Sequence, residues 1–268
     1  MLSRPPRDLD VRSFNPMIII FPEDTVNLRK PDESFIDQAK SFKNNNHTIL
    51  SINDRHKIVS GINFEAPVPA IYRGWMMTID EYSNLYSALI NQNVVLITNP
   101  EQYKRCHYIS GWYDSIKQMT ANTVLFDNRS ALNPNSIPKW GRYFVKDYVK
   151  SLTTKRGSIA NSYEEILEIL ALIEKYRGFI EGGICIREYE NYLPESEERY
   201  FYYNGKYHSR DNRLPSIIES IESSIDCPFY SIDVIRDDQG NDRIVEIGDG
   251  QVSDFKNWTV NTFTAIFN

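Results

Sequence analysis

The chain has 268 residues, of which 41% are hydrophobic and 13% aromatic, and its formal net charge at pH 7 is −6. That amount of apolar side chain can build a sizeable core, in one large domain or in two to three small ones. The acidic balance argues against a dedicated binder of duplex DNA, which is usually basic, so we expect no nucleic-acid partner. We also expect no signal peptide and no membrane partner, because no segment approaches the roughly 20 apolar residues that cross a bilayer.

The cysteine pattern indicates a reducing compartment. Cys106, Cys185 and Cys227 are widely spaced and form neither a CxxC pair nor a zinc pattern with the four histidines. A sparse, odd number of cysteines is typical of a reduced cytosolic protein rather than a disulfide scaffold, so we expect a cytoplasmic location. Residues 1–14 are polar and predict a flexible leader.

The first part of the chain alternates short apolar runs with helical patterns. We predict helices at 33–43 and 80–90, between strands at 17–21, 47–52, 70–73 and 94–97. This alternation predicts an α/β domain with a mainly parallel sheet, which we assign to residues 15–108.

The second part predicts two further lobes, at 109–183 and 184–268. It contains predicted helices at 109–120, 162–176 and 214–225, and predicted strands at 142–150, 184–189, 198–203 and 206–209, followed by a hairpin over 229–247. Asn204-Gly205 is the strongest two-residue hairpin signal. The chain is therefore expected to have an α/β (α+β) fold.

The C-terminal hairpin carries the most informative pattern. A turn centred on Gln239-Gly240 would place Asp233 opposite Glu246, and Val234 opposite Val245. The two carboxylates would then lie roughly 5 Å apart between Cβ atoms, where like charges repel. A divalent cation such as Mg²⁺ would reverse that interaction, since it takes oxygen ligands. The alternative is an exposed hairpin whose acids face water, and a one-residue slip would separate the pair.

Two features upstream of the hairpin could bind phosphate. In the strand at 142–150, alternation places Lys146 and Lys150 on one face, where lysine can act as a point charge, although lysine also protects edge strands. Gly157 and Ser158 could close over phosphates through backbone N–H groups, or form a plain turn. The absence of a Walker A pattern and of GxGxxG argues against a P-loop or Rossmann site.

The order of these pieces resembles the ATP-grasp superfamily. A lysine strand, a Gly-Ser loop, a helix, an apolar strand ending in acid, a Glu-led strand and an Asp–Glu hairpin follow one another over residues 70–255. The stretches FVKDYVKS, EGGICIRE and VEIGDGQVSD look most like its small, mostly uncharacterised phage and bacterial members. The resemblance implies an N-terminal α/β domain followed by two α+β lobes that hold ATP between them.

The resemblance also implies nucleotide-binding roles. Lys146 matches the lysine that contacts ATP phosphate, with Lys150, Gly157 and Ser158 in the phosphate-covering region. The hinge that recognises adenine falls on Ile186, Arg187 and Glu188, and either of the last two could hold its usual acidic position. Glu198 matches the ribose-binding acid, a role that competes with its place in a solvated acidic rim. Asp233 and Glu246 match acids that bind Mg²⁺ or Mn²⁺.

The sequence departs from the family pattern at two positions. Gly248 stands where a metal-binding asparagine is common, and we expect Asp249 to substitute, with Gln251 a weaker candidate. Ser231 stands where many ligases have an arginine. Another cation must then stabilise the acyl phosphate, and the candidates are Arg199 first, then Arg187 and Arg213.

Arg73 follows a predicted strand at the place where such enzymes bind substrate. It could hold a substrate carboxylate, or it could lie in a surface turn. The implied activity is an ATP-dependent carboxylate–amine ligase that forms an acyl phosphate, acting on small-molecule or peptide carboxylates and amines. A phosphotransferase and a non-catalytic nucleotide-binding module are the alternatives. Small family members often pair, so the resemblance also implies a homodimer.

Overall fold

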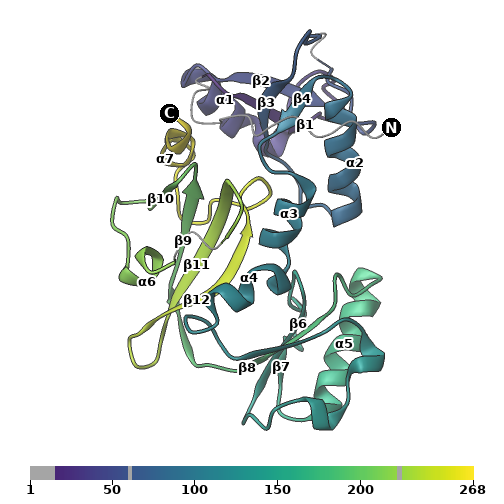
Figure 1. Ribbon diagram of the computed structural model, residues 1–268, viewed down its shortest axis with the longest axis vertical. Coiled ribbons are helices and arrows are strands. Elements are labelled where there is room, and N and C mark those ends of the chain that lie inside the picture. Colours follow the sequence, from purple (N-terminus) through teal and green to yellow (C-terminus); the bar gives the residue numbers. More distant parts are fainter. Residues whose placement is uncertain (1–15, 60–61, 222–224) are drawn as a thin grey trace.

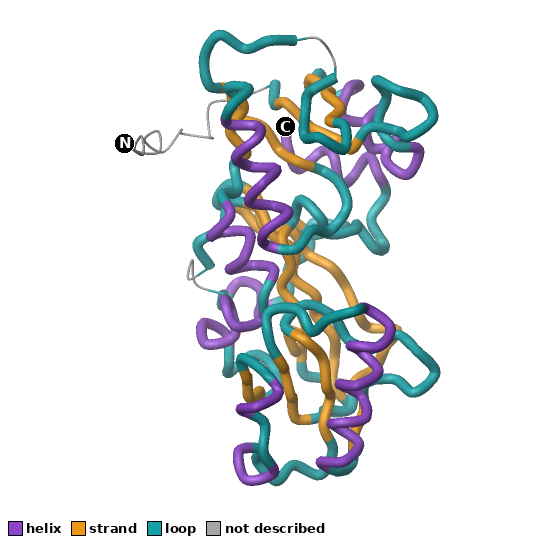
Figure 2. The backbone as a smooth tube through the Cα atoms, turned by 90° about the vertical axis from the view of Figure 1, so that its right-hand side faces the viewer, coloured by secondary structure: helices purple, strands orange, loops and turns teal. Residues whose placement is uncertain are grey.

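Three four-stranded sheets lie one after another along the long axis of the molecule (Figures 1 and 2). The structure, a computed structural model, describes residues 16–59, 62–221 and 225–268. The expected leader at 1–14 lies outside these ranges. Within them, no helix is both long enough and apolar enough to cross a membrane.

The N-terminal sheet is parallel, with strand order β2-β1-β3-β4, as predicted. Its elements are β1 (Ile18–Pro22), η2 (Glu33–Phe35), α1 (Ile36–Asn44), β2 (Thr48–Ile52), β3 (Val68–Tyr72), α2 (Ile79–Ile90) and β4 (Val94–Leu96). The strands form its core because Ile19, Ile20 and Phe21 are fully buried. Helices α3 (Pro100–His107) and α4 (Ile109–Ile116) then lead away from this sheet (Figure 1).

The central sheet is antiparallel, with strand order β5-β8-β6-β7. Its elements are β5 (Thr123–Phe126), η3 (Arg129–Ala131), η4 (Pro134–Ser136), β6 (Tyr143–Asp147), β7 (Ile159–Ala160), α5 (Tyr163–Arg177) and β8 (Ile184–Glu188). Helix α5 buries a stripe of isoleucine and leucine at helical spacing against one face of this sheet. The other face is therefore left for the cleft. Strand β8 pairs with β6, so the central sheet continues past the lobe boundary expected at 183.

The C-terminal sheet is also antiparallel, with strand order β10-β9-β11-β12. Its elements are β9 (Tyr192–Tyr203), β10 (Lys206–His208), α6 (Ser216–Glu219), β11 (Phe229–Asp237), β12 (Asp242–Asp249), α7 (Val260–Thr264) and η5 (Ala265–Phe267). The Asn204-Gly205 hairpin is confirmed by pairing of Tyr203 with Lys206. Helix α6 ends at Glu219, so the predicted helix at 214–225 is too long.

The register of the C-terminal hairpin confirms the central prediction and corrects its neighbour. Asp233 pairs with Glu246, but Val234 pairs with Ile244 rather than with Val245. Near the turn the register is one residue away from the symmetric expectation, and a β-bulge between Ile244 and Glu246 restores it. The parallel N-terminal sheet and the two antiparallel sheets together confirm the predicted fold class.

Candidate functional site

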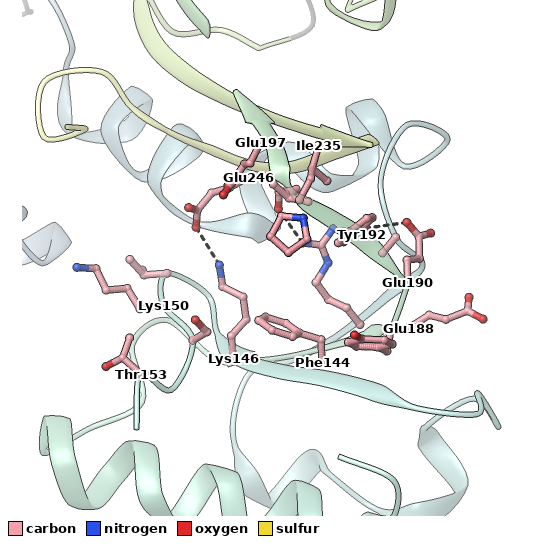
Figure 3. A pocket seen from close by; sticks show the side chains of 17 residues that line it. Phe144, Lys146, Lys150, Thr153, Glu188, Glu190, Tyr192, Glu197, Ile235 and Glu246 are labelled. Carbon is pink, nitrogen blue, oxygen red and sulfur yellow. Dashed lines mark hydrogen bonds and ion pairs between the residues drawn. The ribbon is translucent and has the colours of Figure 1, made fainter. Parts of the chain in front are cut away.

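A cavity of about 550 Å³ lies between the central and C-terminal sheets. The side chains that line it come from both sheets and point toward one another (Figure 3). Lys146, Lys150 and Glu246 lie at one end, and Glu190 and Tyr192 at the other. Charged side chains of both signs therefore surround the cavity, and its lining also has an apolar part that includes Phe144, Ile235 and Val245.

Strand β6 presents Phe144 and Lys146 to the cavity, while Val145 packs on the α5 side. The strand ends at Asp147 because its carboxylate accepts hydrogen bonds from the backbone N–H groups of Val149 (2.8 Å) and Lys150 (2.6 Å). The predicted strand at 142–150 is therefore too long. Lys150 still lines the cavity, but from the turn rather than through alternation.

A row of charged residues crosses the three neighbouring strands β9, β11 and β12. Arg199 pairs with Asp233, which in turn pairs with Glu246. The Arg199 guanidinium holds both carboxylate oxygens of Asp233 at 2.7 Å, a bidentate pairing that favours strong hydrogen bonds. Lys256 lies 2.7 Å from Asp233 Oδ2 and 2.7 Å from Glu197 Oε1. Asp233 is therefore deeply buried, with a side chain only 3% exposed, and is surrounded by cations.

Lys146 connects the two sheets by an ion pair. Its Nζ lies 3.0 Å from Glu246 Oε1, and the Glu246 side chain is 43% exposed (Figure 3). The two sequence-predicted residues therefore meet across the cleft, as the proposed phosphate and metal roles require.

The carboxylate pair fits a divalent cation as a partial ligand set. Asp233 and Glu246 share one sheet face and supply the hard oxygen ligands that Mg²⁺ prefers. Each now has an ammonium group within hydrogen-bond distance, from Lys256 and Lys146 respectively, so each is a place where positive charge is favoured. No cluster of three or more His, Cys, Asp or Glu side chains suited to a metal occurs in the described ranges, so other ligands would have to complete the shell.

Asp249 does not join these two carboxylates. Alternation along β12 places it on the face of Ile247, opposite that of Glu246. Its Oδ1 accepts hydrogen bonds from the backbone (2.9 Å) and side chain (3.3 Å) of Gln251, and its Oδ2 has no partner among the described residues. Burial raises the pKa of Asp249 to about 7, although the Gln251 hydrogen bonds and the charge of Arg73 oppose the rise. Asp249 and Gln251 thus form a buried polar cluster away from the cavity.

The predicted ribose acid also faces elsewhere. Glu198 alternates away from Arg199 and binds the Tyr200 hydroxyl (3.0 Å) and Arg210 (3.2 Å). Its neighbour Glu197 lines the cavity instead. The irregular pairing of β9 with β11 determines which of the adjacent acids points inward, and a sequence pattern does not show it.

The predicted phosphate loop packs on α5 rather than on the cavity. The Ser158 hydroxyl accepts a hydrogen bond from the Leu152 backbone (2.8 Å), and Arg156 forms ion pairs with two glutamates of α5. Gly157 adopts a φ of +67°, which glycine permits. Ser151 and Thr153 line the cavity in place of Gly157 and Ser158.

The predicted hinge divides between the two faces of β8. Ile186 packs in the α5 core, whereas Arg187 and Glu188 line the cavity. Arg187 donates to the carbonyl oxygen of Val245 at 2.7 Å and to the hydroxyl of Thr120. The bulge at Val245 leaves that carbonyl free of the β-ladder, so Arg187 ties the two sheets together.

Two of the remaining predicted arginines have different positions. Arg213 has a side chain that is 87% exposed, pairs with Asp211 and lines neither cavity. Arg73 is buried, and its guanidinium donates to Gln38 Oε1 (3.1 Å) and to the carbonyl oxygen of Ser253 (3.0 Å). Burial lowers the pKa of Arg73 to about 10, so it stays charged at neutral pH. Arg73 is therefore no surface turn residue, and it lines a second cavity of about 500 Å³.

Sequence reasoning missed Lys256. It follows β12 in an irregular segment, with a φ of +40°, so no strand or helix periodicity marks it. Its ammonium is held between Glu197 and Asp233, and although burial lowers its pKa, the hydrogen bonds and charge of Asp233 outweigh that effect and raise it. Lys256 therefore belongs to the charged end of the site.

Solved structures match this chain over most of its length. The D-alanine–D-alanine ligase from Coxiella burnetii has 11% sequence identity and a TM-score of 0.62, with 94% of each chain covered. D-cycloserine synthetase DcsG has 10% identity and a TM-score of 0.61, with 94% of this chain and 100% of that chain covered. ATP-grasp ligase PsnB, solved with a phosphomimetic variant of its minimal precursor, Mg and ADP, has 8% identity and a TM-score of 0.56, covering 94% and 96%.

At such low identities these likenesses show the fold alone. The comparison with curated proteins found no match in sequence. The sequence profile of an ATP-grasp domain family, the third family of its clade, matches residues 111–266, which is more than half of the chain. The chain belongs to this ATP-grasp family.

Proposed function

We propose that this protein is an ATP-dependent carboxylate–amine ligase that works through an acyl phosphate. The main support is the meeting of Lys146 and Glu246 at 3.0 Å across the cleft, with Asp233 on the neighbouring strand. A cation and two carboxylates that converge from opposite sheets suit a metal-bound triphosphate. Family membership and the ligases of similar fold support the same reaction class.

The apolar part of the cavity would hold the adenine ring. Phe144, Tyr192 and Val245 offer flat or apolar surfaces that suit a planar base. The hinge residues Arg187 and Glu188 lie at the same wall, where backbone groups after β8 can contact the base edge. Lys146 and Lys150 would bind phosphate oxygens as point charges.

Asp233 and Glu246 would hold Mg²⁺ or Mn²⁺, whose charge would neutralise the phosphates during transfer. Arg199 remains the first candidate for stabilising the acyl phosphate, because it lines the second cavity beside the carboxylate row. Its Nε and Nη2 are engaged by Asp233 and its Nη1 by Asp254, so it is held rigidly in place. Such preorganised charge is the kind of electrostatic stabilisation that phosphoryl transfer requires.

The proposed reaction has two steps. An oxygen of the substrate carboxylate attacks the γ-phosphorus of ATP, and ADP leaves. The amine nitrogen then attacks the carbonyl carbon of the acyl phosphate, and inorganic phosphate leaves as the amide forms. The substrates would be small-molecule or peptide carboxylates and amines.

The test is ADP release with Mg²⁺ and pooled amino acids. Glu246→Gln should reduce turnover by at least about 100-fold, because it removes a charged metal ligand. Glu198→Gln is the matched control, since Glu198 faces the other side of the sheet, and it should retain turnover. Wild-type turnover in Glu246→Gln would refute the metal role. ADP release that needs a carboxylate but no amine would indicate a phosphotransferase instead, and ATP binding without turnover a binding module.

A further inference from the structure

The second cavity lies directly beside the first. It shares Val149, Lys150 and Glu246 with it, and it is closed by the N-terminal domain and by the segment after β12. We infer that this cavity binds a carboxylate that carries a large apolar, preferably aromatic, group. The inference rests on the proposed function, because it names the class of acid that such a ligase would activate.

One wall of the second cavity is apolar and exposed. Trp75 is 54% exposed and Met76 is 40% exposed, and both line the cavity. The Phe35 ring packs edge-on against the Trp75 ring at 5.0 Å between centroids, and Phe255 lines the cavity as well. Large apolar side chains gathered at a cavity mouth are typical of a binding surface, because they lose contact with water when a ligand covers them.

This wall is held rigidly. The preceding Arg73 is anchored to Gln38 and Ser253, and the Gly74 N–H donates to the carbonyl oxygen of Gln251 at 3.3 Å. A Cβ atom on Gly74 would overlap the Tyr72 hydroxyl group, so only glycine permits the chain to pass this close. The segment that carries Trp75 is therefore fixed, and the apolar wall is formed before any ligand arrives.

The other side of the cavity is cationic. The Lys150 ammonium forms no ion pair or side-chain hydrogen bond within the part of the chain that the structure describes. Lys150 lines both cavities, so a carboxylate bound to it would lie beside the phosphate end of the first cavity. Arg199 supplies a second positive charge on the same side. A ligand with an anionic end and an apolar end matches this arrangement.

The test compares two acids that differ by one ring. Binding of 3-phenylpropionate and of propionate to the full chain is measured by calorimetry, with Mg²⁺ and a non-hydrolysable ATP analogue present. Burial of a phenyl-sized group should make the aromatic acid bind about 10- to 100-fold more tightly. Trp75→Ala should reduce that preference to below about 3-fold, whereas Trp75→Phe should retain most of it.

Phe179→Ala is the matched control, because Phe179 is a 47% exposed aromatic residue that lines neither cavity. It should leave the preference unchanged. Equal affinities for the two acids, no binding of either, or a preference that survives Trp75→Ala would overturn the inference. A ring preference without ADP release from any acid would support this inference while refuting the ligase, and ADP release from small acids alone would do the reverse.

Discussion

Replacing Asp249 by asparagine separates two roles for this carboxyl group. The sequence suggested a metal ligand, whereas the structure places the group in a buried cluster with Gln251, on the opposite face from Glu246. Asparagine has nearly the same shape and keeps the acceptor oxygen for Gln251, but it does not ionise. The variant should therefore change how stability depends on pH while leaving nucleotide binding intact.

The sign and size of the effect follow from the pKa of Asp249, which burial raises from 3.8 to about 7. The folded state keeps a proton that the unfolded chain releases, so folding stability falls as the pH rises through this interval. Each pKa unit corresponds to about 1.36 kcal/mol, so the full shift corresponds to roughly 4 kcal/mol, of which about 2 to 3 kcal/mol is lost between pH 5 and pH 8. Asparagine avoids that loss.

The assay is urea unfolding of wild type and Asp249→Asn at pH 5 and pH 8. The free energy of unfolding of the variant minus that of wild type should increase by about 2 to 3 kcal/mol between these values. Contributions from other titrating groups cancel in this difference. A difference that stays flat with pH would mean that Asp249 is charged in the folded state and that the burial reasoning is wrong. Loss of Mg²⁺-dependent nucleotide binding in the variant, comparable to that in Glu246→Gln, would show that Asp249 is a metal ligand after all.

Two substitutions test the contacts that hold the site together. Arg199→Met should cost roughly 3 kcal/mol in urea unfolding, because it removes the bidentate partner of a buried carboxylate, while Arg213→Met at an exposed position should stay within about 0.5 kcal/mol. Equal effects of the two would refute this account of Asp233. Thr120→Val should cost about 1 to 3 kcal/mol, because its hydroxyl accepts from Arg187 and donates to a β12 carbonyl at 2.6 Å, and an unchanged midpoint would contradict that role.

The sequence was sufficient to predict the carboxylate pair, although for an incomplete reason. Strand alternation and a short turn are local features, so Asp233 and Glu246 were placed on one face. The turn itself is tighter than assumed, since the Asp237 backbone N–H donates to the carbonyl of Asn241 at 2.9 Å. The bulge at Val245 adds one residue and compensates, so the pairing beyond it agrees with the prediction. No sequence pattern marked that bulge, because its carbonyl partner, Arg187, comes from another sheet.

The residues that the sequence placed wrongly depend on such long-range contacts. Glu198 and Glu197 are adjacent, and only the pairing of β9 with β11 decides which one points into the cavity. Ser158 was assigned to phosphate because it follows Gly157, but its hydroxyl binds the Leu152 backbone. Periodicity gives the face of a regular strand, and it gives no direction in loops or beside bulges.

The charged row divides into a fixed part and an exchangeable part. Asp233 is 3% exposed and is held by two hydrogen bonds from Arg199, so separating this pair would leave a buried charge at high cost. Glu246 is 43% exposed and has a single ion pair with Lys146, and such partly exposed pairs contribute roughly 0 to 1 kcal/mol. Binding of nucleotide and metal would therefore displace Lys146 from Glu246 at little cost and leave Arg199 on Asp233. The lysine that leaves the carboxylate is the same residue that the proposed mechanism assigns to phosphate, so the exchange would supply that cation where the phosphates bind.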